Sequence, residues 1–417
     1  MAELISIDEA RRRVLDGVRP LETEDVPLET ALGRVLAEDV TSAIPVPPFD
    51  SSAMDGYAVT AGPAAELEVV DEARAGHPAT ATVSRGTAVR ISTGAAVPEG
   101  ADAVVPVERS ERLAIGRATP ANLADAEAAG PPGATPDGRV RVPATAVGEN
   151  VRYAGEDVRA GDVVLRAGAA LGPAELGVAA SVGRPTVRCA RRPRVFLLVT
   201  GDELTQPGEG LRPGAIYSSN RFALAGQIER AGAEAAGTES VPDTAAGTRT
   251  ALTRALAAAD VVIVSGGVSV GPHDHVKGAL RELGVEERFW GVRLRPGKPA
   301  WFGVRDRTLV YGLPGNPVSA MVTFQLFVRP ALAAMQGAEP SARRGEAILD
   351  QPIPRNPRRE EAVRVRLRPD RDGWHATPTG EQGSHMLTSM LGADALMFVA
   401  SGEGEVSAGE RLEIELL

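Results

Sequence analysis

The stretch 261–277 reads VVIVSGGVSVGPHDHVK and contains a G-x-S-x-G motif with Ser269 at its centre. In many hydrolases this motif places a nucleophilic serine on the sharp turn between a strand and a helix. Here the apolar run that predicts the strand ends near Val264, and a helix cannot easily begin before Pro272. Ser269 therefore falls in the middle of a loop, which argues against an esterase nucleophile.

The same loop is rich in glycine, which suits a backbone that wraps around an anion. A helix is expected to begin near Asp274, and the N–H groups at a helix N-terminus attract negative charge. The loop has neither the Walker A pattern nor G-x-G-x-x-G, so it is not a standard nucleotide loop. The alternative is a tight strand-to-helix turn in which Asp274 only caps the helix. The predicted anion-binding loop comprises Gly266, Gly267, Ser269 and Gly271.

Three acidic residues at the ends of predicted strands also need an explanation. Glu203 and Asp243 each follow a predicted strand, and Asp274 ends the glycine loop. Open parallel sheets bind ligands beyond the carboxyl ends of their strands, so the three carboxylates are expected in one crevice. Taken singly, each is equally well explained as a solvated loop residue or a helix cap. Together with a bound phosphate they indicate Mg²⁺, which takes one or two carboxylates and bridges to phosphate oxygens.

Basic residues accompany these acids in the sequence. Lys277 lies shortly after the glycine loop, and Arg295 and Lys298 belong to the rigid loop RPGKP. Arg and Lys side chains bind phosphate and other oxyanions, although a single Lys is usually a surface residue. In the loop GLPGNP, Asn316 is expected to cap a helix whose first residue is Pro317.

Alternating strand and helix patterns must position these residues. From residue 194 on, apolar runs such as RVFLLVT and DVVIVS alternate with helical segments such as NRFALAGQIERAG, which predicts a central doubly wound parallel sheet. Short apolar runs at about 66–109 predict a β-rich region, and the Val/Arg alternation in EAVRVRLRP predicts a C-terminal small sheet or barrel. Near the start, Ser6 is expected to cap a helix over 6–18, and a second short helix is expected within 28–40.

Composition limits the classes of function. The chain of 417 residues has a formal net charge of −10, which argues against nucleic-acid binding because that depends on Lys and Arg to neutralise phosphates. The single cysteine, Cys189, excludes an intrachain disulfide and a Cys-based metal cluster. The sequence shows no signal-peptide pattern and no run of about 18 apolar residues. No membrane partner is therefore expected, and the cytoplasm is the expected compartment.

Several long motifs together resemble the molybdopterin molybdenumtransferase family, which includes MoeA and the matching E domain of gephyrin. They cover nearly the whole chain in a single order, which chance does not explain. The motifs are FDSSAMDGYAV at 49–59, STGAAVPEGADAVVPVE at 92–108, NVRYAGEDV at 150–158, TGDEL at 200–204, SGGVSVGPHDHVK at 265–277, RPGKP at 295–299 and GLPGNPVSA at 312–320.

The resemblance implies an enzyme of molybdenum cofactor biosynthesis that inserts molybdate into adenylylated molybdopterin, with Mg²⁺ and release of AMP. Its relatives are homodimers with a cleft shared between subunits, and a molybdopterin adenylyltransferase is the expected pathway partner. The implied fold is multidomain α/β plus β. The expected domains are a discontinuous N-terminal domain at 1–45 and 155–190, a β-rich domain at 46–154, a molybdopterin-binding α/β domain at 191–339 and a C-terminal β-barrel domain at 340–417.

The resemblance also assigns roles to single residues. The expected catalytic residues are Asp55, Thr93, Arg152, Asp157, Glu203, Asp243 and Asp274, and the last three are also the expected metal ligands. The expected cofactor-binding residues include those of the anion-binding loop, Gly266, Gly267, Ser269 and Gly271. The other expected cofactor-binding residues, which match the pterin-phosphate and oxyanion pocket and the positions beside it, are Lys277, Arg295, Lys298, Pro314, Gly315, Asn316, Pro317, Ser319, Arg364 and Ser384.

The sequence departs from the family pattern at two places. Relatives often have Lys where Arg295 stands, which keeps the charge but changes the donor geometry. The Ala/Pro/Gly-rich segment at 118–138 is longer than expected and predicts a mobile loop. Two alternatives stay open. A molybdopterin adenylyltransferase would consume ATP with free molybdopterin, and a non-catalytic carrier or scaffold would tolerate Asp274→Ala.

Overall fold

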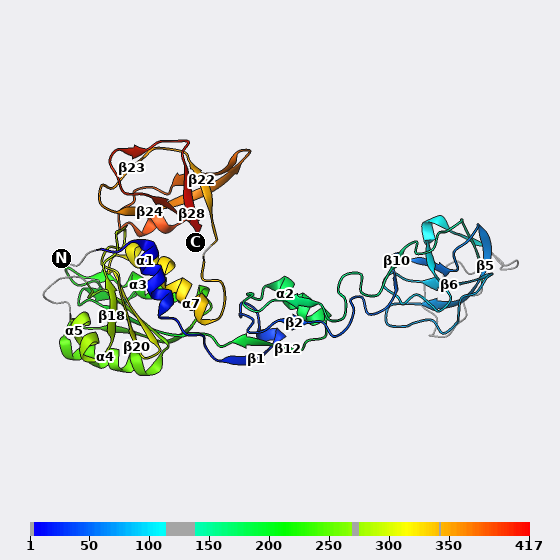
Figure 1. Cartoon of the computed structure of the whole chain (residues 1–417), viewed down its shortest axis with the longest axis horizontal. Coiled ribbons are helices and arrows are strands. Elements are labelled where there is room, and N and C mark those ends of the chain that lie inside the picture. The colour runs from blue at the N-terminus through cyan, green and yellow to red at the C-terminus, as the bar shows by residue number, and fades with distance from the viewer. Residues whose placement is uncertain (1–3, 114–137, 269–274, 342) are drawn as a thin grey trace. The chain divides into compact units, whose positions relative to one another are not determined.

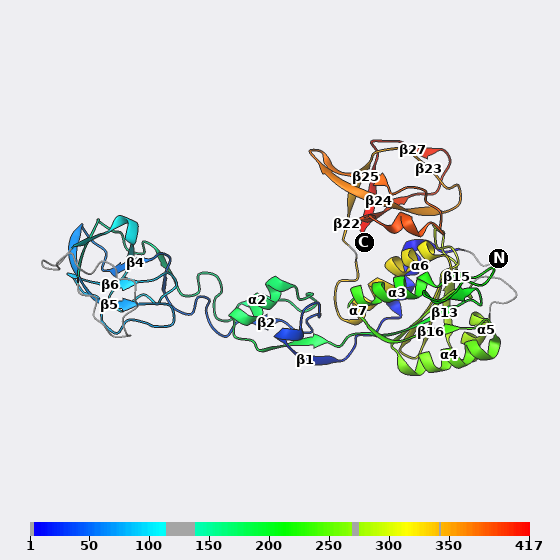
Figure 2. The same ribbon diagram turned by 180° about the vertical axis from the view of Figure 1, so that it is seen from behind.

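The computed structural model describes residues 4–113, 138–268, 275–341 and 343–417, and its ribbon is drawn from opposite sides in Figures 1 and 2. The chain forms two compact units. Unit 1 comprises Met1–Glu38, Ala167–Pro173 and Thr186–Leu417, and unit 2 comprises Asp39–Arg166 and Ala174–Pro185. The domain boundaries expected from the sequence stay a prediction.

Unit 1 contains a six-stranded sheet whose central strands come from the long apolar runs. Both β13 (Arg194–Thr200) and β17 (Val261–Ser265) are largely buried, because helices cover both faces of the sheet. Four neighbouring strands are parallel, as predicted, whereas the two remaining pairings in the sheet are antiparallel. The strand order is β16 (Glu234–Val241), β13, β17, β21 (Thr308–Leu313), β20 (Trp301–Arg305) and β18 (Glu286–Trp290).

Helices on both faces make the sheet doubly wound, as expected (Figures 1 and 2). One face packs against α4 (Ala245–Ala258) and α5 (Val276–Glu282). The other face packs against α1 (Ile7–Asp16), α3 (Ser219–Arg230), α6 (Pro317–Thr323), the π-helical segment η3 (Phe324–Val328) and α7 (Arg329–Met335). The predicted cap of α1 is confirmed, since Ser6 Oγ accepts a hydrogen bond from the Glu9 backbone N–H.

The continuous helix Pro317–Met335 has the length and the apolar composition that a membrane span requires. Its most apolar window has a mean hydropathy of 1.4, but 78% of that window is buried inside the protein. Val318, Leu326 and Leu332 are all fully buried in the core that covers the sheet. The helix carries Ser319, Thr323, Gln325 and Arg329 among its apolar residues, so it is not an uninterrupted apolar run, and the fold uses it as a core helix.

The C-terminal part of unit 1 is a closed five-stranded barrel, which confirms the predicted class. The barrel strands in order are β24 (Glu360–Asp370), β25 (Gly373–Pro378), β22 (Arg344–Leu349), β28 (Arg411–Leu416) and β26 (Ala395–Val399), and β26 pairs back with β24. A short strand, β19 (Leu294–Arg295), extends from the central domain and pairs with β24 in parallel. Val363 and Val365 point into the barrel core, as the alternation predicts.

Unit 2 is β-rich, as predicted for this part of the chain. Its main sheet has the order β7 (Ala103–Pro106), β4 (Gly56–Val59), β6 (Thr87–Ile91), β5 (Ala65–Ala73), β9 (Arg139–Val142) and β8 (Glu111–Leu113). Two short pairs accompany it: β3 (Ser51–Ser52) with β10 (Val151–Arg152), and β2 (Val40–Thr41) with β11 (Val163–Leu165). Of the predicted mobile segment 118–138, all but Gly138 lies outside the described residues.

Three further elements lie close to the boundaries of the two units in the sequence. They are β1 (Thr23–Pro27) and β12 (Thr186–Ala190), which pair with each other in unit 1, and α2 (Pro173–Ser181), which precedes β12. The prediction of a second short α-helix within 28–40 is wrong. Only a 3₁₀ helix, η1 (Leu28–Thr30), forms there, because Gly33 adopts a φ of 73°, a left-handed conformation that stops a helix.

Candidate functional site

The carboxyl ends of β13, β17 and β21 lie at one edge of the sheet, because these strands are parallel. A Cβ atom on Gly266, just after β17, would lie 2.7 Å from Thr200 Oγ1 and 2.9 Å from Thr200 O. Only glycine fits there, so the ends of β13 and β17 approach each other closely. Asn220 of α3 ties in the third loop, since its Nδ2 donates to Ser265 Oγ and to Gly315 O, both at 2.8 Å.

The predicted anion-binding loop is described only in part. Gly266 and Gly267 have φ values of 94° and 64°, which are conformations that glycine adopts readily. Ser269, Gly271 and Asp274 lie outside the described residues. The roles assigned to these three residues stay predictions.

Carboxylates follow two neighbouring strands of the sheet, β13 and β16. The Glu203 side chain lies over Gly201, because a Cβ atom on that glycine would be 2.7 Å from both Glu203 carboxylate oxygens. Asp243 is half-buried, and its backbone N–H donates to Asp202 Oδ1 at 3.1 Å. The two loops are thus joined by Asp202, an acid that the sequence reasoning did not select. Three carboxylates therefore stand beyond the ends of adjacent strands.

A cavity of about 520 Å³ gathers many of the predicted cofactor-binding residues. Its walls come from the RPGKP loop, the start of α6, the residues before β24 and the loop that follows β25. The lining residues are Trp290, Arg295, Pro296, Gly297, Lys298, Pro299, Pro314, Asn316, Ser319, Arg359, Gln382, Gly383, Ser384 and His385. We call this cavity the cationic pocket, since its charged lining groups are basic and no described lining residue is a carboxylate.

Two arginines at or near this pocket form hydrogen bonds with other residues of the protein. Arg295 Nη1 donates to Glu361 Oε1 at 2.7 Å, and the Glu361 side chain is only 9% exposed. Arg364 is fully buried and does not line the pocket. Its Nε and Nη2 donate to Ser389 Oγ at 3.2 and 3.0 Å, and Nη2 also donates to Gly383 O at 3.3 Å. Burial lowers the pKa of Arg364 to about 10, so its guanidinium stays protonated at neutral pH.

The start of α6 is built differently from the expectation. Pro317 is the first helical residue, as predicted, and Asn316 stands at the N-cap position. The prediction that the Asn316 side chain caps the helix is wrong. Its Nδ2 donates instead to Ser384 Oγ at 2.9 Å, which joins α6 to the loop after β25. Ser384 and Ser319 both line the cationic pocket.

Lys277 lies apart from the other predicted cations. It lines a second cavity of about 400 Å³ together with Arg13, Arg281 and Arg288. Its Nζ lies 4.8 Å from the centre of the Trp290 ring, a cation–π contact. Trp290 lines both cavities, so the basic residues predicted as one group are distributed over two adjacent pockets.

The remaining predicted residues belong to unit 2. Asp55 and Thr93 are brought together, since Asp55 Oδ1 accepts hydrogen bonds from Thr93 N at 2.6 Å and Thr93 Oγ1 at 2.9 Å. These two bonds, with a weaker effect of nearby Arg90, lower the pKa of Asp55. Arg152 in β10 and Asp157 after it are exposed. Unit 2 therefore presents an ionised Asp55 on a turn fixed by Thr93.

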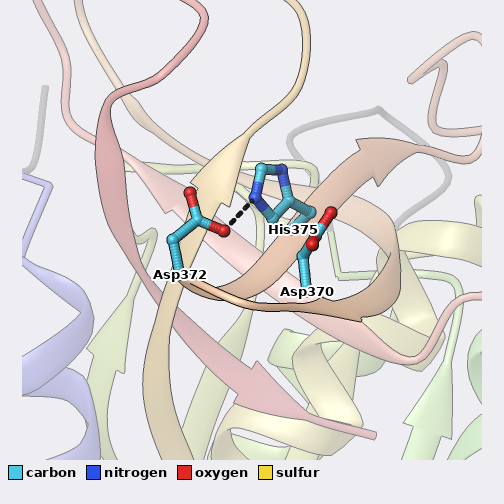
Figure 3. Close-up of side chains that lie close together, drawn as sticks. All are labelled: Asp370, Asp372 and His375. Carbon is cyan, nitrogen blue, oxygen red and sulfur yellow. Dashed lines mark hydrogen bonds and ion pairs between the residues drawn. The ribbon is translucent and has the colours of Figure 1, made fainter.

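A cluster of Asp370, Asp372 and His375 in the β24–β25 hairpin has donor atoms within 4.8 Å of one another (Figure 3). Both His375 nitrogens are already bonded, Nδ1 to Asp350 Oδ1 at 2.8 Å and Nε2 to Asp372 Oδ1 at 2.9 Å. These bonds raise the pKa of His375 and lower that of Asp372. The pKa of Asp350 is lowered first by a hydrogen bond from Thr377 Oγ1 and then by the bond to His375. The cluster is an internally satisfied ion-pair network at the tip of a hairpin, and we assign no metal to it.

Comparisons with known proteins agree with this architecture. A family model described as "MoeA N-terminal region (domain I and II)" matches residues 5–183. A second, "Probable molybdopterin binding domain", matches residues 196–334, and a third, "MoeA C-terminal region (domain IV)", matches residues 346–417. Together the three models match almost the whole chain.

Full-length relatives and solved structures match over the same extent. The chain is 36% identical to the molybdopterin molybdenumtransferase of Haemophilus influenzae, covering 99% of this chain and 98% of that protein. It is 32% identical to the molybdopterin molybdenumtransferase of Bacillus subtilis, covering 99% and 94%. The crystal structure of the molybdopterin biosynthesis MoeA protein from Pyrococcus horikoshii superposes with a TM-score of 0.79 at 30% identity, covering 100% of both chains. The chain therefore belongs to the molybdopterin molybdenumtransferase family.

Proposed function

We propose that the protein is a molybdopterin molybdotransferase that inserts molybdate into adenylylated molybdopterin, with Mg²⁺ and release of AMP. Family membership supports the enzyme class and a place in molybdenum cofactor biosynthesis. The observation that carries the proposal is the pairing of a cationic pocket with a separate set of strand-end carboxylates in one unit. Such a pairing suits a substrate that brings phosphates and an oxyanion to the same protein.

The cationic pocket suits a tetrahedral dianion such as molybdate. Lysine and arginine side chains and two serine hydroxyls line it, and all of these groups donate hydrogen bonds to anionic oxygens. Its volume of about 520 Å³ lies in the ordinary range for small-molecule sites and exceeds what one oxyanion needs. The remaining space suits part of an organic substrate. Molybdate brings its own oxygen atoms, so it needs positioning more than deprotonation.

The strand-end carboxylates suit Mg²⁺ by their chemistry. Hard oxygen donors are the ligands that this ion takes, and one or two carboxylates suffice because water and substrate phosphate complete its shell. Glu203 and Asp243 would hold it, with Asp274 as the third expected ligand and Asp202 fixing the loop that carries Asp243. When bound, Mg²⁺ neutralises the negative charge of phosphate groups.

Unit 2 enters the proposal through dimerisation. We propose a homodimer in which the turn carrying Asp55 belongs to a cleft shared with the partner subunit. The Thr93 hydrogen bonds keep Asp55 ionised and fixed, which suits a group that must present a charge to a neighbouring surface. A molybdopterin adenylyltransferase is the proposed supplier of the adenylylated substrate.

An insertion assay tests the proposal. The purified protein is mixed with adenylylated molybdopterin, Mg²⁺ and molybdate, and AMP and active cofactor are measured together. We expect both products, and we expect neither when Mg²⁺ or molybdate is omitted. Consumption of ATP with free molybdopterin would favour an adenylyltransferase instead. Tight substrate binding without either product would favour a carrier.

A further inference from the structure

A second cavity, of about 450 Å³, lies where helices of the central domain meet the C-terminal barrel. It is lined by residues of α3, α6 and η3 and by residues of η4 (Leu387–Met390) and β28. It shares no described lining residue with the cationic pocket. Its apolar part comprises Met321, Phe324, Met390 and Leu416, whereas its charged side chains are all basic. We call it the amphipathic cavity.

Three arginines, Arg230, Arg329 and Arg343, supply the charge of this cavity, and no described lining residue has an acidic side chain. Arg230 Nη2 donates a hydrogen bond to Leu417 O at 2.9 Å, so this guanidinium is already engaged. Arg329 and Arg343 form no ion pair with a carboxylate in the part of the chain that the structure describes. The cavity therefore offers two positive charges to a bound anion.

Arg329 is poorly satisfied by the protein itself. Its Nε is buried and has no hydrogen-bond partner among the described residues, and its Nη2 makes only a long bond of 3.4 Å to Pro340 O. The buried carboxylate of Glu415 is near but pairs with Arg11. Burial lowers the pKa of Arg329, which shows that its charge is held in an unfavourable environment. A bound anion would compensate a charge that otherwise destabilises the fold.

The amphipathic cavity is built on the π-helical segment η3. Phe324 and Gln325 are the first two residues of this segment and line the cavity, and Arg329 directly follows its last residue. Gln325 Nε2 donates to Leu416 O at 3.3 Å, so the segment also holds the wall that β28 provides. Because π-helical turns are rare and occur frequently at functional sites, this geometry is an indication of a binding site that is independent of the charges.

We propose that the amphipathic cavity binds a small organic anion, namely a carboxylate that carries a short apolar chain. The carboxylate would pair with Arg329 and Arg343, since guanidinium groups bind carboxylates through two parallel hydrogen bonds. The chain would pack against Met321, Phe324 and Met390, where the flexible methionine side chains adapt to its shape. The volume lies in the ordinary range for small-molecule sites. This site goes beyond the proposed function and does not depend on it.

Three probes separate the two parts of the proposed recognition. Hexanoate carries both a carboxylate and an apolar chain, acetate has the charge with hardly any chain, and hexan-1-ol has the chain without the charge. Each is titrated into the full-length protein, and its dissociation constant is measured by ligand-observed NMR. We expect hexanoate to bind at least about tenfold more tightly than either of the other two probes, because only hexanoate uses both parts of the lining.

Charge-removing variants locate the binding site. Arg343→Gln and Arg329→Gln should each weaken hexanoate binding roughly tenfold, because each removes a partner of the carboxylate. Arg249→Gln removes an exposed arginine of α4 that does not line the cavity, and it should change the affinity by less than about twofold. Arg329→Gln should not lower the melting temperature, since it removes a buried charge that has no partner among the described residues. A loss of binding without a loss of stability would distinguish recognition from a structural role.

A variant of the cationic pocket excludes binding at that site. Lys298→Gln should keep the hexanoate affinity of the wild-type protein, because Lys298 lines only the cationic pocket of the two. Loss of hexanoate binding in Lys298→Gln would place the probe in the cationic pocket and overturn the inference. Equal affinities for Arg343→Gln and Arg249→Gln, or hexanoate binding no tighter than acetate, would overturn it as well. None of these results bears on the insertion assay, so the proposed function stands or falls separately.

Discussion

Replacing Gly266 with alanine tests whether the ends of β13 and β17 must touch for the site to form. The substitution carries two costs. An alanine at a φ of 94° pays about 1–2 kcal/mol for a left-handed backbone. Its Cβ would lie 2.7 Å from Thr200 Oγ1 and 2.9 Å from Thr200 O, and relieving such overpacking costs about 1–3 kcal/mol more. The expected total is about 2–5 kcal/mol of unfolding free energy.

Gly208 supplies the matched control for the first cost alone. Its φ is 96°, and a Cβ atom there would have nothing within 4 Å. Gly208→Ala should therefore lose only the backbone part, and Gly266→Ala should be less stable than this control by about 2 kcal/mol. In thermal unfolding, that difference corresponds to a melting temperature roughly 4–8 °C lower. Equal melting temperatures for the two variants would refute the close approach of these strand ends.

Four other predictions address separate parts of the molecule. Asp243→Asn should fold normally and slow AMP release roughly a hundredfold, because the metal loses a charged ligand; AMP release at the wild-type rate would sink the Mg²⁺ assignment. Asn316→Ala should cost about 0.5–1 kcal/mol through its lost bond to Ser384, measured as a shift of the urea midpoint, with an unshifted midpoint as the contrary result. The carboxylate partners of His375 raise its pKa in the folded protein. The folding stability that these ion pairs add is therefore fully present below about pH 6.5 and is lost as the pH rises through the folded pKa. The difference in melting temperature between the wild-type protein and His375→Gln should thus narrow from about pH 6 to about pH 9. A difference that stays constant over this range would contradict a stabilising role of the His375 ion pairs. Sedimentation should show a dimer, and a monomer would rule out the shared cleft.

Local signals in the sequence were sufficient for much of the fold. The runs that form β13 and β17 are apolar apart from their end residues, because strands covered on both faces need no alternation. The cap at Ser6 and the proline that starts α6 follow from local backbone chemistry, and both were predicted. The predicted helix within 28–40 failed because one glycine conformation outweighed a short apolar pattern.

The site was less accessible to sequence reasoning, because its walls come from distant segments. Trp290 separates Lys277 from the other cations through tertiary packing that no local motif reports. Arg359 reaches the pocket only after the barrel closes and brings the residues before β24 beside the RPGKP loop. Asn316 sits at a cap position, yet its side chain reaches Ser384 of a loop 68 residues away. In each of these cases the position of the side chain depends on contacts with residues distant in the sequence, which a local motif does not report.

The location of the bound oxyanion tests the central claim most directly. Crystals soaked in tungstate, which scatters strongly, would give an anomalous difference peak at the heavy atom. The account predicts one dominant peak in the cationic pocket, within hydrogen-bonding reach of Lys298, Arg359 and Ser384. A dominant peak beside Lys277 and Arg281, with the cationic pocket empty, would contradict it.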